Sequence, residues 1–221
     1  MTSLCGRVAL TPLLAAVSFL AFAAATVTAA PLQRDLGHGL VYFRVANAPA
    51  DLPRDTATAK QPCVLDLRYA RADAGAGQQL GAWLADRAGP KHPVFVLANN
   101  STAPVLLHAL VGASGIPGVM TIGISSPQFS PEFPVFQSPV DELSAFEALA
   151  NGASVAAVTT DNPNKQRNDE ASLSRETQPE DAAADTEKDP KEATKAPARI
   201  DAALQRAIHL HRGLQALKRI D

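Results

Sequence analysis

The sequence predicts an α/β fold with a mostly parallel sheet, because three buried strands alternate with two helical segments. The strand segments are continuous apolar runs, "PCVLDLR" (62–68), "PVFVLA" (93–98) and "PGVMTIGIS" (117–125). Such runs are typical of strands that are covered on both faces. Segments 75–89 and 101–115 lie between them and have apolar residues at helical spacing. The order strand, helix, strand, helix, strand indicates βαβ units with right-handed crossovers.

The flanking elements follow from local composition. The segment "GLVYFRVANA" (39–48) has the β-branched and aromatic content of a strand. At the start of the second helix, Ser101 or Thr102 is expected to be the N-cap, and Pro104 fits the first turn, where a missing N–H is tolerated. Residues 125–139 are interrupted by prolines and are expected to be extended, and a short helix is expected to follow over 140–152.

Both ends of the chain differ from this central domain, which we place at 30–159. Residues 1–29 resemble a signal peptide, with Arg7, an apolar stretch and a small-residue "VTA" cleavage signal, so a periplasmic or secreted location is expected. An N-terminal membrane anchor is the alternative. Residues 160–198 form an acidic linker with one leucine and no aromatic residue, and this composition predicts disorder.

The last segment, 199–221, is predicted to be an amphipathic helix. Its apolar stripe consists of Ile200, Ala203, Leu204, Ala207, Ile208, His211 and Leu214. Asp201 favours the N-terminus of this helix, and Lys218 and Arg219 favour its C-terminus. The helix is expected to dock on its own domain, and a partner or a membrane surface is the alternative.

Composition excludes several kinds of site. The formal net charge is −2 and there is no basic stripe, so nucleic acid is not an expected partner. Cys63 is the one cysteine beyond the signal segment and is expected to pack as a small hydrophobe. No metal site or cofactor is indicated, and no membrane span is expected in the mature chain. His108 is expected to be a partly buried helix residue. Asp66 and Arg68 are expected to have a structural role, either as an ion pair or as hydrogen-bonding groups of the loop.

Five segments, taken in order, resemble the landmarks of the tail-specific or C-terminal-processing proteases, the S41 serine peptidase family. They are "GLVYFRV", "PCVLDLR", "HPVFVLANNSTAPVLLHAL", "VMTIGISSPQF" and "RIDAALQRAIHL". The resemblance covers about residues 36–150 and 197–217. It implies a ClpP/crotonase-like ββα superhelix. It also implies a serine nucleophile at a helix start, a lysine general base and backbone donors for an oxyanion.

The positions that carry chemistry in that family hold unsuitable residues here. Pro104 stands at the position of the nucleophile, and Phe129 falls at the spacing of the lysine. Ala72 and Asp73 replace the two glycines of the family's "DLRGNPGG" segment. Because proline has no hydroxyl and phenylalanine has no exchangeable proton, a serine–lysine mechanism is not available. Ser101 and Thr102 are the nearest substitute nucleophiles.

Three hypotheses for the function follow. The first is an exported, catalytically inactive S41-like protein that binds peptides or other envelope proteins. The second is an active serine-type endopeptidase with a relocated nucleophile at Ser101 or Thr102, or with a partner chain that completes the site. The third is an adaptor that acts through the acidic linker and the terminal helix, so that deletion of residues 160–221 abolishes partner binding while the domain stays folded.

Overall fold

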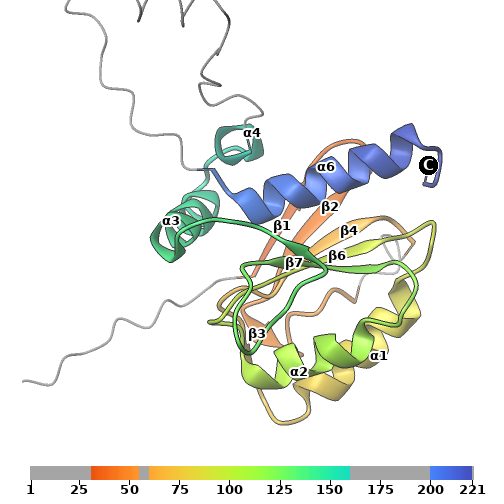
Figure 1. Cartoon of the computed structure of the whole chain (residues 1–221), viewed down its shortest axis with the longest axis vertical. Helices are drawn as coiled ribbons and strands as arrows, with labels where there is room; N and C mark the ends of the chain where they lie inside the picture. Colours follow the sequence, from red (N-terminus) through yellow and green to blue (C-terminus); the bar gives the residue numbers. More distant parts are fainter. Residues whose placement is uncertain (1–30, 55–59, 160–199, 221) are drawn as a thin grey trace, which may run out of the picture.

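The chain is a mixed α/β protein with a six-stranded, mostly parallel sheet of order β1-β2-β4-β6-β7-β8 (Figure 1). The computed structural model describes residues 31–54, 60–159 and 200–220. The strands of this sheet are β1 (Leu32–Asp35), β2 (Val41–Arg44), β4 (Cys63–Asp66), β6 (Val94–Ala98), β7 (Val119–Gly123) and β8 (Phe133–Pro134). Strand β1 is antiparallel to β2, and every other neighbouring pair is parallel. The strands predicted from the three apolar runs are β4, β6 and β7.

The two faces of the sheet are covered by different helices (Figure 1). Helices α1 (Ala76–Arg87) and α2 (Pro104–Ala113) pack on one face, as the crossovers of the βαβ units require. The other face carries α6 (Ala202–Ala216), with α3 (Pro139–Ala150) and α4 (Val155–Val158) beside its first turn. The residues of β4 and β6 are all buried because helices cover both sides.

The strand expected over 39–48 is divided in the structure. It ends as β2 at Arg44, and the chain then forms β3 (Asn47–Ala48), which pairs with β5 (Arg71–Ala72) in a separate two-stranded sheet. The sequence gives no signal at this point because Val45 and Ala46 continue the apolar run and are buried. The segment expected to be extended forms only the two-residue strand β8.

The short helix expected over 140–152 is α3, which spans Pro139–Ala150. Ser138 caps α3 by accepting from the Asp141 N–H, and Gly152, with φ +91°, follows its C-terminus. The expected cap of α2 was wrong. The N-cap of α2 is Ala103 and makes no side-chain bond, because the Thr102 hydroxyl is engaged elsewhere in the turn.

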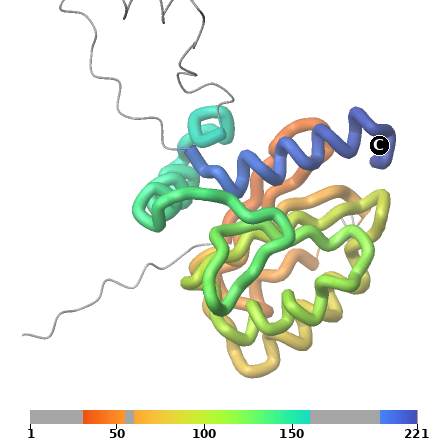
Figure 2. The backbone as a smooth tube through the Cα atoms, viewed as in Figure 1, coloured from red at the N-terminus to blue at the C-terminus, as the bar shows by residue number. Residues whose placement is uncertain are grey.

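The terminal helix α6 lies beside the β1–β2 turn, far away in the sequence (Figure 2). The Gln215 amide donates to the carbonyl of His38 at 3.0 Å, and the His211 ring lies at 3.0 Å from the same oxygen. Its apolar stripe packs on the sheet with Phe95, so α6 covers its own domain. The expected signal peptide and acidic linker lie outside the described residues. Within the residues that are described, no helix has the length and apolar character needed to cross a membrane.

Candidate functional site

Polar side chains gather where β4 and β6 end. These neighbouring strands are parallel, and Asp66 on β4 lies opposite Leu97 on β6. The carboxyl ends of parallel strands meet at one edge of the sheet, which is where ligand sites form in open α/β folds. Tyr69 follows β4 and Asn99 follows β6 at this edge, and the first turn of α3 brings Glu142 against them.

A buried guanidinium, that of Arg68, lies at the centre of this edge. We call the four residues Asp66, Arg68, Glu142 and Asp201 the Arg68 cluster; none is more than 3% exposed. Arg68 binds Asp66 through Nε and Nη2, at 3.0 and 2.7 Å. It binds Asp201 through Nη1 and Nη2, at 2.9 and 2.8 Å. The expected ion pair between Asp66 and Arg68 is therefore confirmed, and Asp201 was missed as its second partner.

Asp201 has two roles at the start of α6. Its Oδ1 accepts from the Leu204 N–H at 3.0 Å, which makes it the N-cap of the helix. The same carboxylate pairs with Arg68, which lies 133 residues earlier. The sequence shows only the capping role, because a pairing over that separation leaves no local pattern.

Glu142 is the least satisfied carboxyl group of the Arg68 cluster. A guanidinium has five N–H donors, and the bonds to Asp66 and Asp201 use four of those on Arg68. The remaining donor is on Nη1, 3.8 Å from Glu142 Oε1, which is too far for a hydrogen bond. Glu142 Oε2 instead accepts from the Asn99 amide at 2.9 Å, and Tyr69 Oη lies 3.5 Å away.

The electrostatics separate these carboxyl groups. Burial alone would raise the pKa of Asp66, but the Arg68 guanidinium outweighs burial and holds that pKa below its usual value. Burial raises the pKa of Glu142, and Arg68 and Asn99 compensate only in part. Burial also raises the pKa of the Tyr69 hydroxyl, and the adjacent Glu142 raises it further. Glu142 thus takes up a proton more readily than Asp66 does.

A small pocket of about 80 Å³ opens beside Glu142. It is lined by Tyr69, Asn99, Asn100, Ser101, Ile124, Pro139 and Glu142. Tyr69 has a left-handed backbone conformation, with φ 61°. Such a conformation is uncommon for a bulky residue and often occurs at binding sites. The pocket combines polar groups from three elements, and Tyr69 and Glu142 gave no functional signal in the sequence.

The two substitute nucleophiles have different environments. The Thr102 hydroxyl is buried; it donates to the Leu67 carbonyl at 3.0 Å and accepts from the Asn99 N–H at 3.1 Å. These bonds tie the turn to the residue that follows β4 and engage the Thr102 hydroxyl as both donor and acceptor. Ser101 is exposed and lines the pocket. Its backbone N–H donates to Asn99 Oδ1 at 3.0 Å.

The positions that the resemblance assigns to catalysis have structural roles. Pro104 is the first residue of α2. Phe129 is 3% exposed and belongs to the core under α1 and α2, so its ring packs away from the pocket. Ala72 belongs to β5, and the Asp73 N–H donates to the Ala48 carbonyl at 3.4 Å. The Asp73 N–H is therefore engaged and does not face a reacting group.

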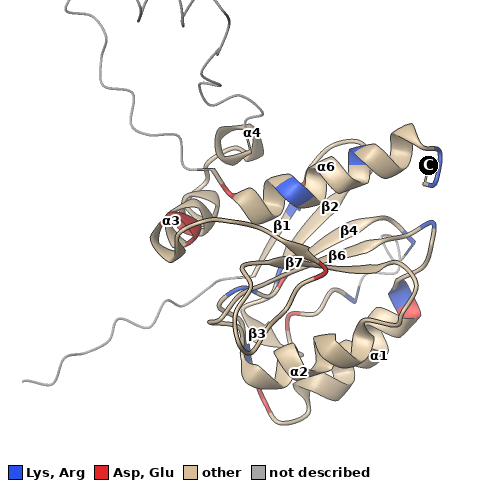
Figure 3. Cartoon of the chain, in the orientation of Figure 1, with Lys and Arg blue, Asp and Glu red and all other residues tan. Residues whose placement is uncertain are grey.

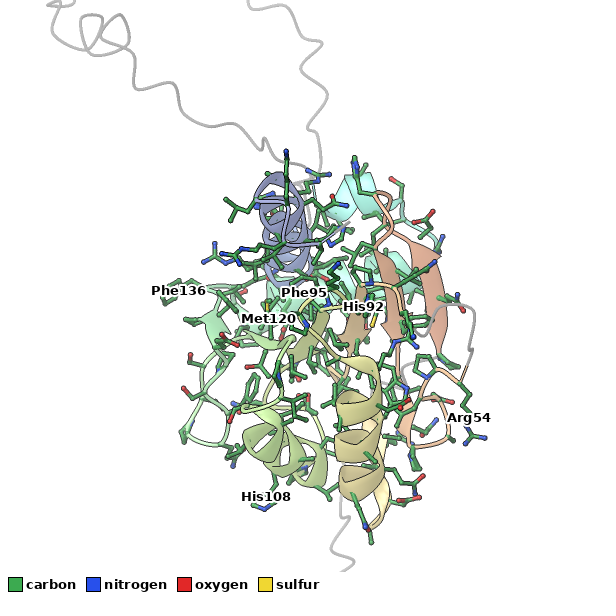
Figure 4. All side chains as sticks on the ribbon, turned by 90° about the vertical axis from the view of Figure 1, so that its right-hand side faces the viewer. Arg54, His92, Phe95, His108, Met120 and Phe136 are labelled. Carbon is green, nitrogen blue, oxygen red and sulfur yellow. The ribbon has the colours of Figure 1, made fainter. Side chains whose placement is uncertain are left out.

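The burial of His108 and of Cys63 can also be compared with the expectations from the sequence. His108 is exposed on the outer side of α2 (Figure 4), so the expectation of partial burial was wrong. It falls on the solvent side of a helix whose Leu106, Leu107 and Leu110 face the sheet. Cys63 is fully buried, as expected, and burial raises the pKa of its thiol.

In Figure 3 the positions of the charged residues are scattered along the described ribbon. Among the residues with described positions, no group of three or more His, Cys, Asp or Glu residues could hold a metal ion. No protein-family model matches the chain, and no curated protein sequence matches it either.

Proposed function

We propose that this chain is a non-catalytic peptide-binding protein of S41 peptidase ancestry, with a crotonase-like fold and an exported location. The observation that carries the proposal is Pro104, which is the first residue of α2 at the position where the resemblance requires a nucleophile. A proline at this position supports the helix start and has no atom that can attack a carbonyl carbon.

The other two catalytic positions support the same conclusion. A general base must reach the nucleophile, whereas Phe129 is a buried core residue under the opposite face of the sheet from Glu142. An oxyanion site needs free N–H donors, whereas the Asp73 N–H is bonded to Ala48. Loss of a single such donor reduces rates by about a hundredfold or more. All three losses together leave no serine–lysine mechanism.

Peptide binding is supported by the edge of the sheet beside the pocket. Strand β8 is the last strand of the sheet order, and its outer side has no strand partner among the described residues. A sheet edge can accept an extended peptide by main-chain hydrogen bonding, here mainly through carbonyl acceptors, because Pro134 of the two-residue β8 has no N–H to donate. Phe136 is 97% exposed and lies at the outside of the molecule (Figure 4), and Val140, which follows Pro139 of the pocket, is 77% exposed. These side chains offer exposed apolar surface on the segment that leads to the pocket.

A serine-type endopeptidase with a relocated nucleophile is the second candidate. It is favoured by one observation, that Ser101 and Glu142 line the same pocket. The raised pKa of Glu142 brings this carboxyl group closer to the range in which a general base operates near neutral pH.

The experiment that separates the two candidates is a cleavage assay on the full chain. The substrate is an unfolded protein with an apolar C-terminus, followed by mass spectrometry over a day, with binding of the same substrate measured in parallel. Binding without new fragments supports the proposal. Fragments from the natural chain that disappear with Ser101→Ala and persist with Ser130→Ala, an exposed serine that does not line the pocket, would establish the relocated nucleophile.

A further inference from the structure

The Arg68 cluster has one more carboxyl group than it has nearby cations. Its carboxyl groups are Asp66, Glu142 and Asp201, and its guanidinium is Arg68. Arg44 is the second buried guanidinium, and its Nε donates at 3.1 Å to the Tyr42 hydroxyl, which in turn donates to Asp66. Three carboxyl groups therefore face two guanidinium groups. A buried site is stable when its charges are balanced, so one positive charge or one proton is missing.

Glu142 is the carboxyl group that lacks a bonded cation. Its side chain is 3% exposed, and its Oε1 is a buried acceptor without a hydrogen-bond partner in the described part of the chain. Asp66 and Asp201 are each held by two bonds from Arg68. Glu142 is also the residue of the cluster that lines the pocket, so its side chain separates the buried Oε1 from a candidate ligand site.

We propose that the pocket binds a primary ammonium group, from a peptide N-terminus or a lysine side chain, with the Glu142 carboxylate as its counter-ion. This inference rests on the proposed peptide-binding function and names the group of the peptide that is recognised. An ammonium group is a compact charge with three donors. Glu142, Asn100 and Ser101, which line the pocket, carry oxygen acceptors for such a group, and the volume of about 80 Å³ suits a small group.

An anion and a divalent cation are less suitable ligands for this pocket than an ammonium group. An anion would lie next to Glu142 with its like charge, and the pocket is lined by no Lys or Arg. A divalent cation requires several oxygen ligands, whereas Glu142 is the one acidic residue of the pocket lining. Tyr69, Ile124 and Pro139 supply apolar surface for the carbon atoms next to an ammonium nitrogen.

Binding should depend on pH. The groups around Glu142 are Arg68, Asp66, Asp201, Tyr69 and Asn99. Burial raises the pKa of Glu142, so a proton and an ammonium group compete for the same carboxylate. Affinity should therefore fall as the pH is lowered through the raised pKa, while a ligand amine stays charged.

The test uses three hexapeptides, titrated into the full chain by calorimetry. They share one Ala- and Phe-containing sequence, except that one residue of the third peptide is replaced by lysine. The first has a free N-terminus, the second is N-acetylated, and the third is acetylated but contains one lysine. Each is measured with the natural chain, with Glu142→Gln and with Glu147→Gln. Glu147 lies on the same helix but is exposed and does not line the pocket, so it is the matched control.

We expect the free-amine or the lysine peptide to bind at least about tenfold more tightly than the acetylated one, because a charge-assisted bond is gained. The preference should disappear in Glu142→Gln and remain in Glu147→Gln. Which of the two amine peptides binds distinguishes a terminal amine from a lysine. Ser101→Leu narrows the pocket at an exposed position, and it should remove the same preference if Glu142→Gln fails to fold.

Other outcomes contradict the inference in separable ways. Equal binding of all three peptides overturns ammonium recognition and leaves peptide binding intact. A preference that survives in Glu142→Gln or Ser101→Leu places the amine elsewhere and also overturns the inference. Absence of binding by every peptide, together with absence of binding to the unfolded protein in the cleavage assay, overturns the proposed function as well.

Discussion

At the scale of single residues, Arg68 is the side chain on which the most polar contacts depend. It is fully buried, and its two bidentate pairs join the end of β4 to the start of α6. Buried pairs contribute little net stability compared with apolar groups of the same shape, but removal of one partner leaves the others uncompensated. Arg68 is therefore expected to affect stability mainly because its removal would leave buried carboxylates without a cation. The strength of its bonds in the intact protein contributes less.

Replacement of Arg68 by methionine should lower the free energy of unfolding by about 3–5 kcal/mol, because Asp66 and Asp201 would be left as buried carboxylates without a cation. Urea-induced unfolding measures this change. The matched variant is Arg71→Met, at an exposed position three residues further on, which should be nearly neutral. Equal losses in the two variants would contradict the role assigned to Arg68.

At the scale of elements, the helices and strands of the βαβ units were predictable, because each carries its own period of apolar residues. Strands β4, β6 and β7 and helices α1 and α2 lie where the apolar runs and the helical spacing placed them. The break between β2 and β3 was not predictable, because the pairing of Asn47 with Arg71 creates it, and no local pattern records that pairing.

The same distinction applies to the candidate site. The turn from Asn99 to Pro104 was recognised from its sequence, because a strand that leads through small polar residues into a helix is a local pattern. Tyr69, Glu142 and Asp201 were not recognised as part of a site. They reach it through contacts that span tens of residues or more, and each has an ordinary local role in a turn or a helix start.

Helix α6 should contribute to stability through its buried side. Leu204 is fully buried against the sheet, whereas Leu217 at the end of the helix is 72% exposed. Leu204→Ala should therefore lower the free energy of unfolding by about 2–5 kcal/mol, because it leaves a cavity. Leu217→Ala should change it by no more than about 0.5 kcal/mol. Chemical denaturation compares the two, and similar small effects would mean that α6 contributes little.

This docking also changes one expectation of the adaptor hypothesis. Deletion of residues 160–221 would remove Asp201 from Arg68 and uncover the apolar face around Phe95. The remaining domain is therefore expected to lose its cooperative unfolding transition rather than stay folded. Calorimetry of the truncated chain measures this, and an unchanged transition would show that α6 is dispensable.

Substitution of two glycines, one on β7 and one on α2, is expected to change stability in opposite directions. A side chain at Gly123 on β7 would overlap the Ala98 carbonyl oxygen and would lie 3.0 Å from the Phe129 ring. Gly123→Ala should therefore lower stability by about 1–3 kcal/mol or more. Gly112 on α2 meets nothing within 4 Å, so Gly112→Ala should raise stability by about 1 kcal/mol or less. Melting temperatures that move in the same direction would contradict this reading.

At the scale of the whole molecule, buried carboxyl groups lie on one side of the sheet. The face under α1 and α2 is covered mainly by apolar core residues and has Arg87 as its buried charged group, whereas the face under α3 and α6 contains the Arg68 cluster and His211. Stability should consequently depend on pH mainly through the α3 and α6 face.

His211 is expected to make the folded protein less stable as the pH falls. Burial lowers the pKa of His211, although the hydrogen bond with the His38 carbonyl opposes this. A lowered folded pKa means that the unfolded chain binds the proton more readily, so the contribution is present above the ordinary pKa of about 6.5 and is lost as the pH falls. His211→Asn should reduce the loss of stability between about pH 7.5 and 5.5, as measured by urea-induced unfolding at each pH.

Glu142 acts in the opposite direction, because its folded pKa is raised. Its contribution is present below the ordinary carboxyl pKa and is lost as the pH rises through the folded value. The His211 comparison is therefore made in the Glu142→Gln background, where this opposing titration is absent. A pH profile of the His211 variant identical to that of its parent would contradict the assignment.

The separation of 133 residues between Arg68 and Asp201 also has a consequence for biosynthesis. A chain is made from its N-terminus, and contacts between distant residues form late in folding. Until Asp201 and α6 have been made and have left the ribosome, Arg68 has no Asp201 to bind, and one face of the sheet has no helix over it. The nascent chain should therefore stay incompletely folded until α6 emerges, which makes it a client for chaperones that bind nascent chains.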